Sequence, residues 1–185
     1  AEKEAIAEAV AEYLPDGASL FLSIGTTAEI IAQVLRKRQG LKVITNNLHA
    51  AEVLHQQPGF DVSVTGGTIR NHNGGIVGPQ AIQIVDQYRT DFAIISIGAV
   101  DSDGTLLDFY ADEVTIAQAM MRNSRHVLLT VDHTKFSRTA TVAQGRIEDI
   151  SALFSDCIPP QNILERLRTN GIEFHLCPPA GLATH

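Results

Sequence analysis

Short apolar segments alternate with amphipathic helical segments along almost the whole chain. The expected strands cover residues 19–24, 42–45, 61–64, 91–97, 126–131, 150–154 and 173–177. Most of them are apolar along their length rather than at every second residue, which is typical of strands buried on both faces. We therefore expect an α/β fold with a mostly parallel sheet and helices on both of its faces.

Helical periodicity connects these strands. The expected helices cover residues 1–14, 27–38, 49–57, 79–87, 113–123 and 162–170. Gly40 ends the second of them and Pro58-Gly59 ends the third, as glycine and proline commonly do. Since no linker interrupts this alternation, residues 1–185 are expected to form a single domain.

The composition limits what such a domain can do. With 185 residues, of which 44% are hydrophobic and 19% charged, the chain is an ordinary globular domain. Its net charge of −7 argues against binding nucleic acid by itself, because phosphate neutralisation needs clustered Lys and Arg. No apolar run is long enough to span a membrane, no signal peptide is visible, and Cys157 and Cys177 make no disulfide framework. These features favour the cytoplasm, which is reducing.

Polar loops follow the predicted strands. In parallel α/β sheets, ligands bind beyond the carboxyl ends of the strands, so these loops are the candidates for a binding site. The candidate ligand-binding residues are Gly25, Thr26, Thr27, Asn46, Asn47, Gly66, Gly67, Arg70, Asp101, Asp108, Glu113, Asp132 and Lys135.

Two of these loops carry groups suited to an anion. Gly25-Thr26-Thr27 lies between a strand and a helix start, where free backbone N–H groups and threonine hydroxyls can bind phosphate. Lys135 offers three donors to a phosphate oxygen, and Asp132 could orient it or accept from a sugar hydroxyl. The alternatives are a plain turn with Thr27 as the N-cap, and a solvated ion pair.

The remaining candidates are more ambiguous. Asn46 and Asn47 suit hydroxyl recognition or helix capping. Arg70, just past Gly66-Gly67, could bind phosphate or carboxylate through two hydrogen bonds, or be a surface arginine. The carboxylates Asp101, Asp108 and Glu113 could transfer protons, bind polyol hydroxyls or cap a helix, and their spacing does not decide.

Several kinds of chemistry are not predicted. The chain has no G-x-G-x-x-G, no phosphate loop with G-K-[ST] and no G-x-S-x-G. Its seven histidines show no H-x-x-x-H or H-E-x-x-H spacing. We therefore predict no catalytic residue, no metal site and no cofactor.

Six short motifs also follow one another in a recognisable order. They are Ile24-Gly25-Thr26-Thr27, Thr45-Asn46-Asn47-Leu48, Thr65-Gly66-Gly67, Gly74-Gly75-Ile76-Val77-Gly78, Asp101-Ser102-Asp103-Gly104 and Val131-Asp132-His133-Thr134-Lys135-Phe136. Together they resemble the C-terminal sensor domain of DeoR-family transcriptional repressors, over about residues 5–177. Residues 74–78 and 123–127 look most like the branch of the glycerol-3-phosphate regulon repressors.

This resemblance implies a fold similar to ribose-5-phosphate isomerase, glucosamine-6-phosphate deaminase and the CoA transferases. It implies a phosphosugar-type pocket, with phosphate near Gly25, Thr26, Thr27 and Lys135. It also implies that the family's winged helix-turn-helix, which binds operator DNA, is absent from this chain and would precede the helix at residues 3–14.

We therefore expect the effector-sensing domain of a bacterial repressor of carbohydrate or glycerol metabolism, not an enzyme. Its effector would be a phosphorylated metabolite, with glycerol-3-phosphate favoured. A homo-oligomer is expected, because twofold proteins commonly match twofold operators. A phosphosugar isomerase or deaminase on the same fold is the alternative, although Gly98-Ala99-Val100-Asp101-Ser102 stands where ribose-phosphate isomerases carry Asp-Gly-Ala-Asp-Glu.

Overall fold

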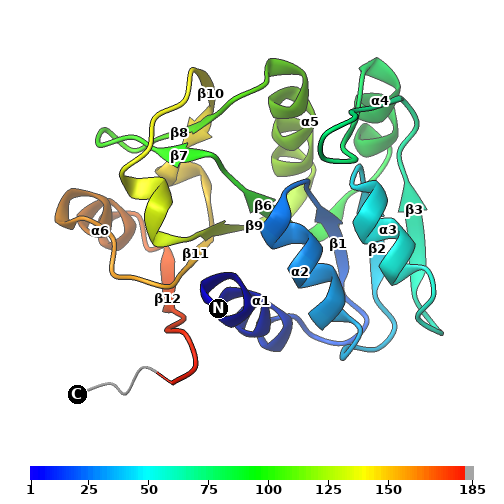
Figure 1. The fold of residues 1–185 in the computed structure, drawn as a ribbon, viewed down its shortest axis with the longest axis horizontal. Helices are drawn as coiled ribbons and strands as arrows, with labels where there is room; N and C mark the ends of the chain where they lie inside the picture. Colours follow the sequence, from blue (N-terminus) through cyan, green and yellow to red (C-terminus); the bar gives the residue numbers. More distant parts are fainter. Residues whose placement is uncertain (182–185) are drawn as a thin grey trace.

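Seven parallel strands form the central sheet of the structure, a computed structural model that describes residues 1–181 (Figure 1). Their order is β12-β11-β9-β6-β1-β2-β3, and every neighbouring pair is parallel. The strands are β1 (Ser19–Leu22), β2 (Lys42–Thr45), β3 (Asp61–Val64), β6 (Thr90–Ser96), β9 (Ser124–Val131), β11 (Ala152–Ser155) and β12 (Glu173–Leu176). The predicted parallel sheet is confirmed, and all seven strands expected from the sequence belong to it.

Helices cover both faces of this sheet. One face carries α1 (Glu2–Tyr13), α2 (Thr26–Leu35) and α3 (Leu48–Leu54), and the other carries α4 (Pro79–Asp86), α5 (Ala111–Arg122) and α6 (Gln161–Thr169). Side chains alternate across a strand, so Leu20 and Leu22 of β1 join the first core and Phe21 joins the second. All three are fully buried, which contributes roughly 1.5–3 kcal/mol for each.

The strand order reverses between β1 and β6. From β1 the chain adds β2 and β3 on one side, and it then crosses to place β6, β9, β11 and β12 on the other. A crevice opens beyond the carboxyl ends of the strands at such a switch point, and ligands of open α/β sheets bind there. The topology therefore favours the segments that follow β1 and β6.

Shorter strands form two small additional sheets. They are β4 (Thr68–Ile69) with β5 (Ile76–Val77), and β7 (Ala99–Val100) with β8 (Thr105–Asp108) and β10 (Val142–Arg146). Two 3-10 helices, η1 (His133–Phe136) and η2 (Ile147–Asp149), complete the structure. None of these five strands was expected from the sequence; β4, β5 and β7, with two residues each, are too short to show a period.

Two further findings bear on the chemistry of the chain. Both cysteines are free thiols, and burial raises the pKa of Cys177 to about 11, which keeps that thiol protonated and unreactive at neutral pH. Among residues 1–181, no helix combines the length and the apolar character that crossing a membrane requires.

Candidate functional site

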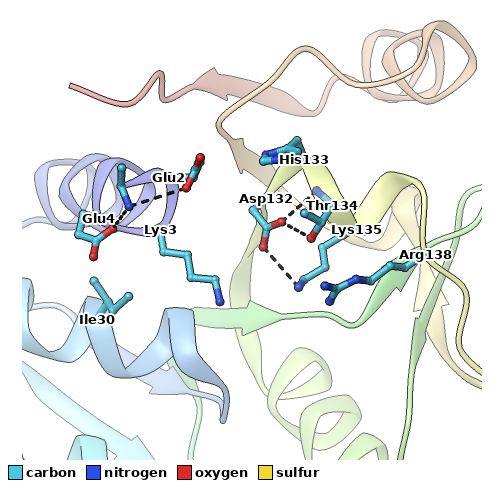
Figure 2. A pocket seen from close by; sticks show the side chains of 10 residues that line it. Glu2, Lys3, Glu4, Ile30, Asp132, His133, Thr134, Lys135 and Arg138 are labelled. Atoms are coloured by element: carbon cyan, nitrogen blue, oxygen red, sulfur yellow. Dashed lines mark hydrogen bonds and ion pairs between the residues drawn. The ribbon is translucent and has the colours of Figure 1, made fainter. Parts of the chain in front are cut away.

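A cleft of about 430 Å³ opens at the switch point, beyond the carboxyl ends of β1 and β6. The lining residues are Lys3, Ile24, Gly25, Thr26, Thr27, Glu29, His72, Asn73, Ser96, Ile97, Gly98, Asp108, Phe109, Tyr110, Glu113 and Lys135. A second hollow, of about 320 Å³, adjoins it and shares Lys3 and Lys135 (Figure 2). We call the first hollow the main cleft and the second the side cleft.

Hydroxyl groups tie together the strand ends below the main cleft. The Ser96 backbone N–H, at the end of β6, donates to Ser23 Oγ just past β1 (3.2 Å). The Ser96 hydroxyl in turn bonds the Thr130 hydroxyl on β9 (3.1 Å). These bonds hold three neighbouring strand ends in one arrangement, which gives the cleft a rigid floor.

The N-terminus of α2 forms one end of the main cleft. Gly25 is the N-cap, and its φ of 126° is one that residues with a Cβ rarely adopt. No side chain caps this helix, so Thr27 is not its N-cap, and the first backbone N–H groups have no partner within the helix. Partial positive charge and free donors at this point can bind an anion.

Cationic side chains lie beside this helix start. Lys135 of η1 is 18% exposed, and its Nζ lies 3.3 Å from Asp132 Oδ2. Figure 2 shows the ammonium groups of Lys3 and Lys135 directed into the same space, with the Arg138 guanidinium next to them. Burial alone would raise the pKa of Asp132, but hydrogen bonds from Thr134 and the charge of Lys135 hold that pKa below its ordinary value. Asp132 therefore stays ionised and orients Lys135.

Carboxylates also line the main cleft. Glu113, in the first turn of α5, is 9% exposed and accepts a hydrogen bond from Asn73 Nδ2 (2.8 Å). Burial, and secondarily the charge of Glu113, raises the pKa of Asp108, against the opposing effects of the Phe109 N–H and Lys135. The main cleft therefore combines anion-binding groups with carboxylates that can accept hydrogen bonds from hydroxyls.

Comparisons with known proteins identify the family of this chain. Residues 1–157 match the family model described as the DeoR C terminal sensor domain. The chain belongs to the DeoR family. The HTH-type transcriptional repressor CsqR of Escherichia coli is 45% identical over 175 residues, which are 95% of this chain and 67% of that protein. The Glycerol-3-phosphate regulon repressor of E. coli is 42% identical over 176 residues, 95% of this chain and 70% of that protein.

Solved structures confirm the predicted fold of this DeoR-family domain. Ribose 5-phosphate isomerase A from Methanocaldococcus jannaschii superimposes with a TM-score of 0.54 at 17% identity, over 72% of this chain and 53% of that one. At this identity the likeness shows the fold alone. The curated relatives named above are transcriptional repressors, which indicates that the chain is part of a regulator.

Of the predicted site residues, the main cleft brings together Gly25, Thr26, Thr27, Asp108, Glu113 and Lys135. Asp132 lines the side cleft. Arg70 lies behind the main cleft, where it pairs with Asp112 and Glu113, and its guanidinium lies 4.3 Å from the centre of the Tyr110 ring. Arg70 therefore positions two lining residues and does not itself line the cleft.

Both asparagines after β2 have structural partners in this DeoR-family domain. Asn47 is the N-cap of α3, where its Oδ1 accepts from the Ala50 N–H and its Nδ2 donates to the Ser23 carbonyl (3.2 Å). Asn46 Nδ2 donates to the Ile76 carbonyl, and its buried Oδ1 has no partner among residues 1–181. Both side chains are buried and neither lines the main cleft.

Three further candidates serve turns instead of the main cleft. Gly67 has a φ of 133°, and a Cβ there would meet the Val77 carbonyl at 2.3 Å, so the β4–β5 pair requires glycine at this point. Gly66 precedes it and does not line the cleft. Asp101 is exposed and closes the β7–β8 turn, where its Oδ1 accepts from the Ser102 N–H.

Several lining residues were missing from the prediction. Lys3 lies on the first helix, far in sequence from any strand end, so the rule about strand ends could not select it. His72 and Asn73 lie between β4 and β5 and line the cleft, and no sequence pattern indicates that this segment reaches it. Phe109 and Tyr110, just ahead of α5, are exposed aromatic side chains, and the sequence does not show that exposure.

One group of possible metal ligands occurs among residues 1–181. Ligand atoms of Glu2, His133 and Asp156 all lie within 4.8 Å of one another, although no sequence spacing connects them. His133 Nδ1 already bonds Asp156 Oδ2 at 2.7 Å, and this bond raises the pKa of His133. The ion pair accounts for two of the three groups without a metal.

Proposed function

We propose that the main cleft is the effector site of a transcriptional repressor and binds a small phosphorylated metabolite. The observation that carries this proposal is that one cleft is lined by a helix N-terminus, by Lys135 and by the carboxylates of Asp108 and Glu113. The phosphate would lie at the α2 N-terminus beside Lys135, and the ligand hydroxyls would face Asp108 and Glu113. A phosphorylated polyol or sugar has this arrangement of charge.

Glycerol-3-phosphate is the first candidate for the effector, supported by the relative named Glycerol-3-phosphate regulon repressor. The relative named CsqR has similar identity and a different name, so similarity alone does not select the effector. A test should therefore vary the hydroxyl end of the ligand and keep the phosphate. The cleft volume of about 430 Å³ also accommodates longer phosphorylated chains than a three-carbon one.

A thermal-shift panel tests the phosphate assignment. Phosphorylated metabolites of three to six carbons are compared with their dephosphorylated counterparts, since ligand binding to the native state raises its stability by mass action. We expect a shift with at least one phosphorylated compound and none with its dephosphorylated partner. Equal binding of glycerol and glycerol-3-phosphate would contradict the assignment of a phosphate site.

The same preparation tests the enzymatic alternative. Asp108, Glu113 and Lys135 share a cleft on a fold that also supports isomerases. The curated relatives are repressors, so we expect no turnover of ribose-5-phosphate or glucosamine-6-phosphate. Turnover near ~1 per second or faster would overturn the regulator assignment.

Control of transcription requires coupling to operator DNA through a segment outside this acidic chain. A coupling free energy of about 1–3 kcal/mol would change operator affinity by about 5- to 150-fold. Operator DNA must then change ligand affinity of the full-length repressor by the same factor. Operator titrations with and without ligand, and ligand titrations with and without operator, measure both effects. An operator affinity that does not change when ligand is bound would exclude effector sensing.

We further propose that the domain self-associates, since closed dimers are the commonest oligomers and match twofold operators. Light scattering at tens of micromolar measures this directly. A monomer at that concentration would count against the proposal.

A further inference from the structure

Lys3 lines both the main cleft and the side cleft. Among residues 1–181, it and Lys135 are the residues that line both hollows. Lys135 reaches the clefts from η1, after β9, whereas Lys3 reaches them from the first turn of α1. Two elements that are distant in sequence therefore place ammonium groups in one space (Figure 2).

The cationic side chains at this point have few direct ion-pair partners. Lys135 has Asp132 at 3.3 Å, but within residues 1–181 neither Lys3 nor Arg138 has a carboxylate within 4 Å. Like charges that face the same space repel one another, and an anion between them removes this cost and gains attraction from each. The α2 N-terminus, on the wall of the main cleft, adds to the same field.

The first turn of α1 is also its least anchored part. The buried residues of α1 are Ile6, Ala7, Val10 and Ala11, all beyond that turn. Helical segments with few buried contacts open easily. A contact between Lys3 and a bound anion would therefore stabilise the part of α1 that packing holds least.

We propose that Lys3 binds the phosphate of the effector together with Lys135, so that an occupied cleft fixes the first turn of α1 against η1. This inference rests on the proposed function of the main cleft. The domain is C-terminal in its family, so the rest of a relative precedes α1. Lys3 thus connects the effector to the junction with the preceding part of the repressor, and its role is recognition and positioning.

Hydrogen exchange and calorimetry test this connection, with glycerol-3-phosphate and inorganic phosphate as probes. In the unsubstituted domain, saturating probe should slow the exchange of amides in residues 5–8, whose bonds close the first turn. Lys3→Ala should weaken binding by about tenfold, equivalent to about 1.4 kcal/mol. In that variant, saturating probe should slow amide exchange at the α2 N-terminus but not in residues 5–8.

Two further variants separate charge from folding. Lys3→Arg keeps the charge and should restore binding to within about threefold, because either cation can bind phosphate. Lys42→Ala removes an exposed lysine at the amino end of β2 and should change neither binding nor exchange in α1.

The outcomes distinguish the inference from the proposed function. If a probe binds, but Lys3→Ala leaves its affinity and the exchange of residues 5–8 unchanged, Lys3 is not a phosphate ligand and the proposed function stands. If neither probe binds at millimolar concentration, the phosphate site fails and this inference fails with it.

Discussion

The segments after β1 and β2 carry similar sequence signals but have different environments. Both strands end at the same edge of the sheet, and each is followed by polar residues and a helix. Gly25-Thr26-Thr27 lines the main cleft, and no side chain caps the helix that it begins. Asn46-Asn47 is buried, and its side-chain amides bond to neighbouring backbone.

The strand order explains the difference. β1 lies at the reversal of the strand order. The chain leaves β1 and its neighbour β6 toward opposite sides of the sheet, and a crevice forms between the two connections. β2 lies between β1 and β3, and the β4–β5 pair covers its end through the bonded pair Asn47–Gly75. Ligand-binding capacity therefore depends on the position of a loop relative to the switch point, as well as on its residue types. The segment after β2 supports the segment after β1 through the bond from Asn47 to Ser23.

The largest expected effect falls on the supporting segment. Asn47→Ala removes the N-cap of α3 and leaves the Ser23 carbonyl without its donor. We expect a loss of about 2–3 kcal/mol in the free energy of unfolding, from the cap and the orphaned group together. Chemical denaturation measures it, and Asn71→Ala, at an exposed position, is the matched control. Unchanged stability in the Asn47 variant would refute its role as a support.

Lys135→Ala should produce the opposite pattern, with a larger effect on binding than on stability. Losing a hydrogen bond to a charged group costs about 1.5–3 kcal/mol, so affinity for a phosphorylated effector should fall by at least about tenfold. The variant leaves the buried Asp132 carboxylate without its ion pair, but Thr134 still donates hydrogen bonds to it, so the loss of stability should be the smaller effect. Calorimetry with Lys135→Arg as the control decides, and full affinity in Lys135→Ala would place the phosphate elsewhere.

The sequence was sufficient for the sheet and for one end of the cleft. Apolar runs and glycine or proline stops determine parallel strands, because burial on both faces demands such runs. The rule about strand ends then selected Gly25, Thr26, Thr27 and Lys135, which do line the main cleft. Whether they bind a phosphate stays a prediction.

The sequence was insufficient where tertiary packing decides. Asn46, Asn47 and Asp101 satisfied the same rule, yet each has a structural partner, and capping and binding demand the same residue types. Lys3 and Asn73 reach the main cleft from segments distant in sequence, and no local pattern records such an approach. The position of the switch point could be read only from the strand order.

Thr27→Val tests the cleft-lining segment more finely. Valine keeps the shape of threonine and removes the hydroxyl, so folding should be nearly unaffected on the half-buried surface at Thr27. If that hydroxyl donates to the phosphate, affinity should fall by about three- to tenfold, less than for the lysine. Thr139→Val, at an exposed position outside the clefts, provides the baseline. An affinity equal to this baseline would leave phosphate binding to the backbone donors and the lysines.

Asp108→Asn carries the smallest expected effect, and it separates the two ends of the main cleft. Burial raises the pKa of Asp108, so the folded state holds its proton more tightly than the unfolded state does. Stability therefore falls as the pH rises from the ordinary carboxyl value of about 4 through the raised pKa, and the penalty persists at neutral pH. Asparagine avoids this penalty and still offers an oxygen to the Phe109 N–H, so at pH 7 Tm should rise by up to about 2 °C. The gain should vanish as the pH approaches about 4. Binding of inorganic phosphate should not weaken, because the cationic groups are intact and one negative charge is removed from the cleft, whereas a phosphorylated polyol should bind a few-fold more weakly. Asp101→Asn, exposed and outside both clefts, should alter neither stability nor binding. If Asp108→Asn weakens inorganic phosphate and the phosphorylated polyol equally, the main cleft is not divided into a phosphate end and a hydroxyl end.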